Sequence, residues 1–131
     1  MNMNEREMEA GLAQTANYRY AQQVGSQLFV AGQVPHNANA QIVGTHDPHT
    51  QATRCLENLR TLITQYGFRE DDIRQLTIYV VGDRQALTSA WQAVTEWFDS
   101  DVPPATLLGV ALLGYEDQLV EIDAVVVSES H

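Results

Sequence analysis

Two carboxylates near the C-terminus have the spacing of an acid–base site. In the run Val120-Glu121-Ile122-Asp123-Ala124, the alternation of a β-strand places Glu121 and Asp123 on one face and the apolar residues on the other. At about 3.3 Å per residue, their backbones lie roughly 7 Å apart. A carboxylate among apolar neighbours can act as a general acid or base. The alternative is a strand at the rim of the sheet, where both carboxylates face water or pair with arginine.

The histidines and the one cysteine carry weaker chemical signals. His46 and His49 flank Asp47, with His36 upstream. A His-x-x-His pair across the start of a helix is not a standard zinc geometry, and no cysteine pair accompanies it. We therefore expect solvated loop histidines and no metal ion. Cys55 falls within an apolar helical stripe, so we expect a core residue rather than a nucleophile.

The charge of the chain excludes several functions. Seventeen acidic residues stand against seven basic ones, which gives a net charge of −10 at pH 7. All seven basic residues are scattered arginines, so no lysine is present to form a Schiff base or to anchor pyridoxal phosphate. Nucleic acid is not an expected partner, because phosphate binding needs clustered basic charge. No glycine-rich nucleotide fingerprint appears either, and we expect no cofactor.

The pattern of apolar residues predicts the elements that must position these groups. The 131 residues suit one compact domain, with a polar leader at 1–16 that contains a helical turn around 5–12, and a domain at 17–131. Within the domain, hydrophobic periodicity, helix caps and turn residues mark the boundaries. We expect strands at 18–24 and 28–31 joined by a type II′ turn at Gly25-Ser26, followed by a short strand at Ile42-Val43. A helix is expected from the Asp47 cap to Gly67, and a second helix is capped by Asp83. The remaining expected strands are at Ile73–Val81, 105–111 and 119–127.

The sequence also predicts the cellular compartment of the protein. The longest apolar run, residues 107–113, is much shorter than the ~20 residues that a membrane helix needs, so no membrane partner is expected. The acidic N-terminal residues do not resemble a secretory signal. A single cysteine favours a reducing compartment, and the sequence therefore predicts a soluble cytoplasmic protein.

The central strand predicts that the chain associates with copies of itself. Leu76, Ile78 and Val80 alternate onto one face of this strand, while Tyr79 and Val81 fall on the other. Two helices can cover only one face of the sheet, and a sheet that is apolar on both faces needs a cover on both. We therefore expect a homo-oligomer with small-molecule clefts between its subunits.

Two separated motifs resemble a known family. Residues 24–35 read VGSQLFVAGQVP, and residues 103–106, 109–111 and 120–125 read PPAT, GVA and VEIDAV. These segments resemble the opening "VGxxxFVSGQxP" and the closing "PPARxxxxVxxL…VEIEAVA" signatures of the RidA (YjgF) family. The resemblance runs from about residue 18 to residue 127, in the family's order.

The resemblance implies a fold and a site. It implies a chorismate-mutase-like α+β fold, with a mixed sheet, two helices on one face, and a homotrimeric barrel. Typical members hydrolyse reactive imines and enamines to a carbonyl product and ammonia. By matching position, Glu121 is the glutamate that holds or activates water, while Tyr18 and Gly32 line the pocket.

This sequence departs from the family pattern at four positions of the pocket. The arginine that pairs with the substrate carboxylate is matched by Thr106, the loop serine by Ala31, the cysteine by Leu108, and the helix asparagine by Trp91. Threonine supplies one hydroxyl and no charge, so it cannot replace a bidentate arginine–carboxylate pair. We expect a cleft that is less polar and does not select a carboxylate.

Three functions remain after these comparisons of residues. The first is a deaminase of imines or enamines with altered specificity, in which Glu121 activates water. The second is a small-molecule binding or regulatory trimer without chemistry, which the loss of polar groups from the cleft favours. The third is an endoribonuclease or translation inhibitor, which the acidic, lysine-free composition opposes.

Overall fold

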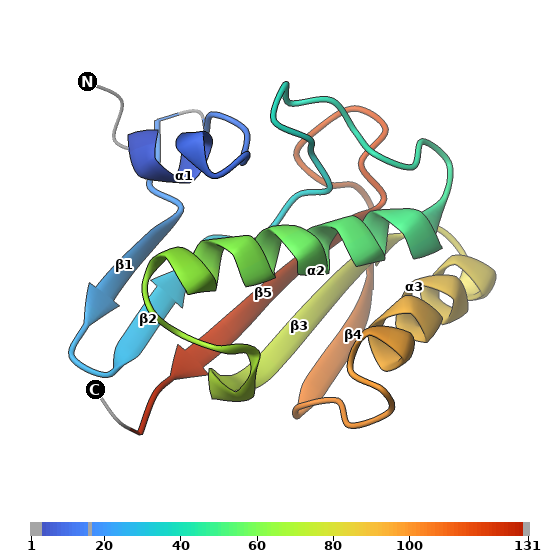
Figure 1. Ribbon diagram of the computed structural model, residues 1–131. Helices are drawn as coiled ribbons and strands as arrows, with labels where there is room; N and C mark the ends of the chain where they lie inside the picture. The colour runs from blue at the N-terminus through green and yellow to red at the C-terminus, as the bar shows by residue number, and fades with distance from the viewer. Residues whose placement is uncertain (1–3, 16, 130–131) are drawn as a thin grey trace.

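The chain forms an α+β domain built on one five-stranded mixed sheet (Figure 1). The computed structural model describes residues 4–15 and 17–129. The strand order is β1-β2-β5-β3-β4; β3 and β4 are parallel and the other neighbours are antiparallel. The elements are α1 (Glu5–Glu9), β1 (Ala21–Val24), β2 (Gln27–Val30), α2 (Pro48–Gln65), the 3₁₀ turn η1 (Glu70–Asp72), β3 (Ile73–Val81), α3 (Arg84–Trp97), β4 (Ala105–Val110) and β5 (Val120–Val127).

The N-terminal hairpin is confirmed, with a later start than predicted. Val24 pairs with Gln27 across a two-residue turn, and Gly25 has φ +59°, the sign that the first position of a type II′ turn requires. Residues 18–20 lie outside the strand: the Tyr20 carbonyl still accepts from the Ala31 N–H at 2.8 Å, but other backbone groups of this segment bind Asn4. The Asn4 side chain donates to the Tyr18 carbonyl at 2.8 Å and accepts from the Tyr20 N–H at 2.9 Å.

The predicted strand at Ile42-Val43 was wrong. Ile42 forms only an isolated bridge with His36, and the Val43 N–H donates to the Pro35 carbonyl at 2.8 Å. The ladder stops there because Pro35 has no N–H to return the hydrogen bond. Residues 32–47 therefore form an irregular connection that leads into α2.

Helix α2 begins and ends where its caps predict. Asp47 accepts hydrogen bonds from the Thr50 N–H at 3.2 Å and the Thr50 hydroxyl at 2.7 Å, and Pro48 occupies the first turn. Gly67, with φ +81°, follows the last turn. The predicted apolar stripe is buried, and it includes Cys55, which is a core residue as expected. Its buried members are Ala52, Cys55, Leu56, Leu59, Leu62 and Ile63.

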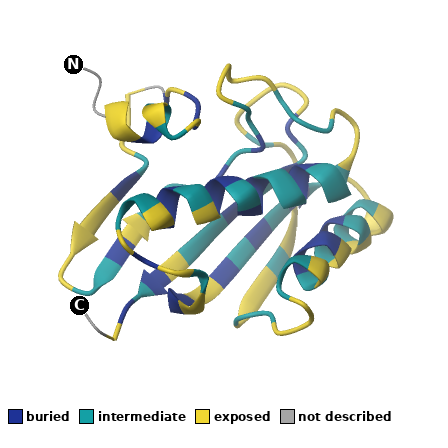
Figure 2. Ribbon diagram, viewed as in Figure 1, coloured by how far each residue is buried: buried dark blue, intermediate teal, exposed yellow. Residues whose placement is uncertain are grey.

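The two long helices cover one face of the sheet and leave the other open (Figure 1). Buried residues alternate along β3, where Leu76, Ile78 and Val80 lie under the helices (Figure 2). On the opposite face, Phe29 and Val125 are neighbours across β2 and β5, and their exposed fractions are 54% and 38%. The prediction of a sheet with apolar residues on both faces is confirmed. We name this second surface the open face.

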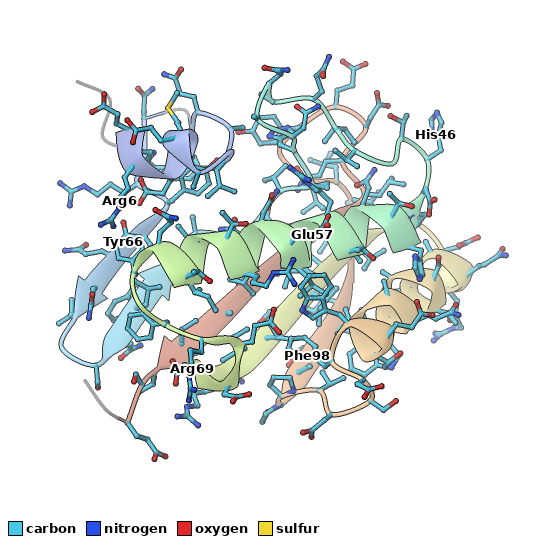
Figure 3. The ribbon with its side chains drawn as sticks, viewed as in Figure 1. Arg6, His46, Glu57, Tyr66, Arg69 and Phe98 are labelled. Carbon is cyan, nitrogen blue, oxygen red and sulfur yellow. The ribbon has the colours of Figure 1, made fainter. Side chains whose placement is uncertain are left out.

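The N-terminal segment packs onto the domain. In α1, the Glu7 carboxylate accepts a hydrogen bond from the Tyr66 hydroxyl at 2.7 Å, and the Arg6 guanidinium lies 4.4 Å from the Tyr66 ring (Figure 3). Leu12 and Ala13 are buried, with 3% of each exposed. In the described part of the chain, no helix has the length and apolar character to cross a bilayer.

Candidate functional site

Glu121 lies on the open face at the start of β5. Its neighbour Ile122 is buried under the helices, so the alternation of the strand turns Glu121 the other way, beside Tyr79 of β3. The Gln118 side-chain amide donates to Glu121 Oε1 at 3.2 Å. Among residues 4–15 and 17–129, no ion pair includes Glu121. The carboxylate therefore has a neutral partner and forms no ion pair with the described residues.

Gly32 is the residue that makes room for this carboxylate. The residue after it, Gln33, exchanges backbone hydrogen bonds with Ile122, at 2.7 Å and 3.1 Å. This pairing brings Gly32 next to Glu121. A Cβ at position 32 would lie 2.3 Å from Glu121 Oε2, closer than side-chain atoms can approach. The close approach, and not the backbone conformation, explains a glycine at this position. The φ of Gly32 does not lie in the left-handed region, so other residues could adopt it.

Two buried glutamines, which the sequence patterns did not reveal as site residues, hold the loop before Glu121. Gln118 accepts from the Tyr115 N–H at 3.2 Å while its amide reaches Glu121. Gln51 of α2 is fully buried, and it donates to the carbonyls of Gly44 and Asp117 at 3.1 Å and 3.0 Å. Its Oε1 accepts from the N–H groups of residues 119 and 120, at 2.7 Å and 3.3 Å. A signal was present, because Gln51 precedes Cys55 by four residues on the buried stripe.

Tyr18 lies near Glu121 at the edge of a small cavity. The cavity has a volume of about 20 Å³, which is room for one water molecule. Burial, the neighbouring Tyr115 and the Glu121 carboxylate together raise the pKa of Tyr18 to about 12. The Tyr18 hydroxyl is therefore protonated near neutral pH and can donate a hydrogen bond. The lining residues include Ala13, Gln14, Thr15, Tyr18, Tyr20, Gly32, Gln33, Val34, His36, Asn58 and Tyr115.

The histidines are in three different surroundings. His36 is half-buried and makes an edge-to-face contact with the Tyr115 ring at 4.6 Å, so the expectation of a solvated residue was wrong there. Burial lowers the pKa of His36, which keeps the ring neutral near pH 7. His46 is exposed in the loop before α2 (Figure 3), and His49 pairs with Glu96 at 2.9 Å. Within the described residues, no cluster of three potential metal ligands is present.

The predicted pocket residues divide into two groups. Gly32 lies against Glu121 and lines a cavity with Tyr18, and Ala31 is adjacent in the chain. Asp123 shares the face of Glu121 but accepts a hydrogen bond from the Tyr79 hydroxyl at 2.9 Å, so the two carboxylates have different partners.

Three of the predicted pocket residues are not beside Glu121 within one chain. Thr106 and Leu108 lie on β4, separated from β5 by β3, and they pair with Thr77 and Tyr79. Leu108 is 42% exposed on the open face. Trp91 belongs to α3 and packs against the core on the opposite face of the sheet. A single cleft containing all of these residues would need more than one copy of the chain.

Comparison with known proteins identifies relatives of this chain by sequence. A RutC family protein of Pyrococcus horikoshii is 27% identical over 112 residues, which are 86% of this chain and 87% of that protein. A 2-iminobutanoate/2-iminopropanoate deaminase of Salmonella typhimurium is 26% identical over 106 residues, 79% of this chain and 81% of the relative.

The fold also matches solved structures. The crystal structure of TdcF from E. coli with bound serine superposes with a TM-score of 0.81, at 24% identity, over 92% of this chain and 95% of that one. The YjgF gene product of E. coli gives a TM-score of 0.79 at 24% identity, over 91% and 94%. The sequence model of the family described as Endoribonuclease L-PSP matches residues 8–128. The chain therefore belongs to this family, the one that includes RidA and YjgF.

Proposed function

We propose that the chain hydrolyses reactive imines, including those formed by tautomerisation of enamines, to a carbonyl product and ammonia. The observation that carries the proposal is the Glu121 carboxylate, which is held by Gln118 and pressed against Gly32 with no described cation beside it. A carboxylate held in this way can act as a general base towards water. Relatives that are named as deaminases support the same reaction at 26% identity.

In the proposed reaction, Glu121 moves a proton in each of two steps. Its carboxylate takes a proton from water as the water oxygen bonds to the imine carbon, and the proton then passes to the nitrogen, which gives a carbinolamine. Glu121 next takes the proton of the new hydroxyl and returns it to the nitrogen, so that the C–N bond breaks and ammonia leaves. The protonated hydroxyl of Tyr18 can donate a hydrogen bond to the substrate nitrogen during addition.

We propose further that the substrate lacks the carboxylate that typical family members recognise. The family's arginine is matched here by Thr106, which is exposed on β4 and carries no charge. With Glu121 facing the cleft, a substrate carboxylate would meet repulsion and no ion-pair partner from the matched position. A cytoplasmic site of action, which the single cysteine favours, belongs to the same proposal.

A non-catalytic ligand-binding role is the second candidate. The open face is apolar, because Phe29, Leu108 and Val125 are exposed on it. An apolar ligand held between subunits would suit these features. An endoribonuclease is not proposed, because the net charge of −10 opposes binding to phosphate.

We infer that the open face is covered by other copies, as a homotrimer. Phe29, Leu108, Val125 and Val24 are exposed on or beside this face, and exposed apolar residues in one patch are typical of an interface. The resemblance to the family makes three copies the expected number. In that assembly, Thr106 and Leu108 of one subunit can complete the pocket of another.

Phe29→Glu is expected to disrupt this assembly. A buried carboxylate without a partner is strongly unfavourable, so the variant should elute as a smaller species than the native protein. Size-exclusion chromatography with light scattering gives the mass of each. The exposed helix residue Gln92, replaced by glutamate, is the matched control and should leave the mass unchanged. A native protein of monomer mass would contradict the inference.

The test of the proposed reaction is ammonia release from imines generated in situ by an amino-acid or amine oxidase. The panel spans imines with and without a carboxylate, and with charged, polar and apolar groups. We expect turnover of apolar imines, and a loss of about 100-fold or more in kcat for Glu121→Gln. Thr106→Arg should move activity towards imines with a carboxylate. No turnover of any imine by a folded native protein would refute hydrolysis and leave ligand binding.

A further inference from the structure

The loop between β4 and β5 places an aromatic ring at the mouth of the pocket. Tyr115 is 40% exposed and lines the cavity together with Tyr18 and Gly32. The edge-to-face contact with His36 has an interplanar angle of 73°, and the Tyr115 N–H is held by Gln118 Oε1 at 3.2 Å. The ring is thus oriented by contacts on its own loop and on the loop at 32–47, while part of its surface stays available to a ligand.

A second aromatic ring lies beside the first. Tyr18 is also 40% exposed, and it lines the same cavity as Tyr115. Aromatic rings prefer offset or edge-to-face contacts with a further ring, and their faces also attract cations. This mouth therefore favours a ligand that carries a planar ring or a positive charge over an aliphatic or anionic one.

The charges around the pocket favour a cation. Glu121 has the neutral Gln118 as its partner, and Glu116 and Asp117 are on the same loop as Tyr115. Arg54, which donates to the carbonyl of the pocket residue His36 at 3.1 Å, lies 3.9 Å from Glu57.

We propose that the ligand of the Glu121 site is a protonated imine that carries an aromatic group and no carboxylate, with Glu121 as its counter-ion and the Tyr115 ring as the wall against its ring. This inference rests on the proposed hydrolase function and names its substrate class. The reaction stays balanced: the water oxygen becomes the carbonyl oxygen, the C–N bond breaks, and the nitrogen leaves as ammonium. Tyr115 is then a specificity-determining residue, and Glu121 returns to its carboxylate form.

The experiment measures binding of three stable probes by calorimetry. Benzylamine carries a ring and an ammonium group, n-butylamine carries the ammonium group alone, and benzoate carries the ring with a carboxylate. We expect benzylamine to bind about tenfold more tightly than n-butylamine, and benzoate to show no measurable binding. If benzoate binds as tightly as benzylamine, or if n-butylamine does, the inference is wrong.

Variants of Tyr115 separate the ring from the hydroxyl. Tyr115→Phe keeps the ring and should hold benzylamine within about threefold, whereas Tyr115→Ala and Tyr115→Leu should weaken benzylamine about tenfold and n-butylamine by a smaller factor. Tyr115→Leu retains apolar bulk, so it answers the question if the alanine variant does not fold. Unchanged benzylamine affinity in the leucine variant would overturn the role of the ring.

The binding experiment can fail or succeed independently of the proposed hydrolysis, because the affinity for a probe is measured without turnover. If imines are hydrolysed but the probes show no preference for benzylamine, only the assignment of substrate class fails. If benzylamine binds through Tyr115 and no imine is hydrolysed, the ligand class is supported and the hydrolase function is refuted.

Discussion

Gly32→Ala is expected to lower kcat on the best imine substrate by about 100-fold while the protein stays folded. The alanine Cβ would lie 2.3 Å from Glu121 Oε2 and 2.8 Å from its carboxyl carbon, so the carboxylate must move. The atoms displaced are the far end of a flexible side chain, and we therefore expect a change of less than about 1 kcal/mol in the free energy of unfolding. A displaced general base no longer meets the attacking water.

The control for this prediction is Gly109→Ala on β4. A Cβ at Gly109 would meet only Leu87 Cδ1, at 3.9 Å, which is an ordinary contact. Both variants should be compared in steady-state ammonia release and in urea unfolding. Full activity in Gly32→Ala would show that the position of the Glu121 carboxylate does not matter for turnover. Loss of activity with unfolding of the protein would trace the effect to stability instead.

Gln51→Leu is expected to produce the largest loss of stability, about 3 kcal/mol in the free energy of unfolding. Leucine keeps a similar volume but removes all four hydrogen bonds of the Gln51 side chain. Two carbonyls and two N–H groups from segments far apart in the chain then lose their partners in a buried place. Because these groups include the backbone immediately before Glu121, activity should fall as well.

Urea unfolding at 25 °C measures this effect. Gln92→Leu, on an exposed position of α3, is the matched control and should change stability by no more than about 0.5 kcal/mol. A loss below about 1 kcal/mol for Gln51→Leu would mean that the four backbone groups find other partners. Hydrogen exchange at residues 117–120 would then locate the rearrangement.

The local elements were predictable because their signals lie within a few residues. Asp47, Pro48 and Gly67 bound α2 through a cap, a first-turn proline and a left-handed residue, and the β-branched run at Ile73–Val81 is the observed β3. Apart from the strand expected at Ile42-Val43, the order of strands and long helices is confirmed, and so is the two-sided apolar character of the sheet. These features depend on hydrophobic periodicity and helix capping, and both signals lie within a single segment of the sequence.

The packing of the N-terminal segment could not be predicted from local sequence patterns. Its composition is polar, yet Asn4 and Glu7 are buried, because their partners Tyr18, Tyr20 and Tyr66 come from other parts of the chain. A polar residue with a distant hydrogen-bond partner has the same sequence signal as a solvated one. The predicted boundary at residue 16 stays a prediction, while the contacts show the preceding segment packed against the domain.

The sequence by itself determined the strand that presents Glu121 and Asp123, the helices that cover one face, and the absence of lysine chemistry. Only the tertiary structure decided that Glu121 meets Gly32, that Gln118 and Gln51 hold its loop, and that Tyr115 and Tyr18 line one cavity. The difference has a physical reason. Alternation and capping act over a few residues, whereas the site is assembled by hydrogen bonds and close approaches between segments that meet only after the sheet has formed.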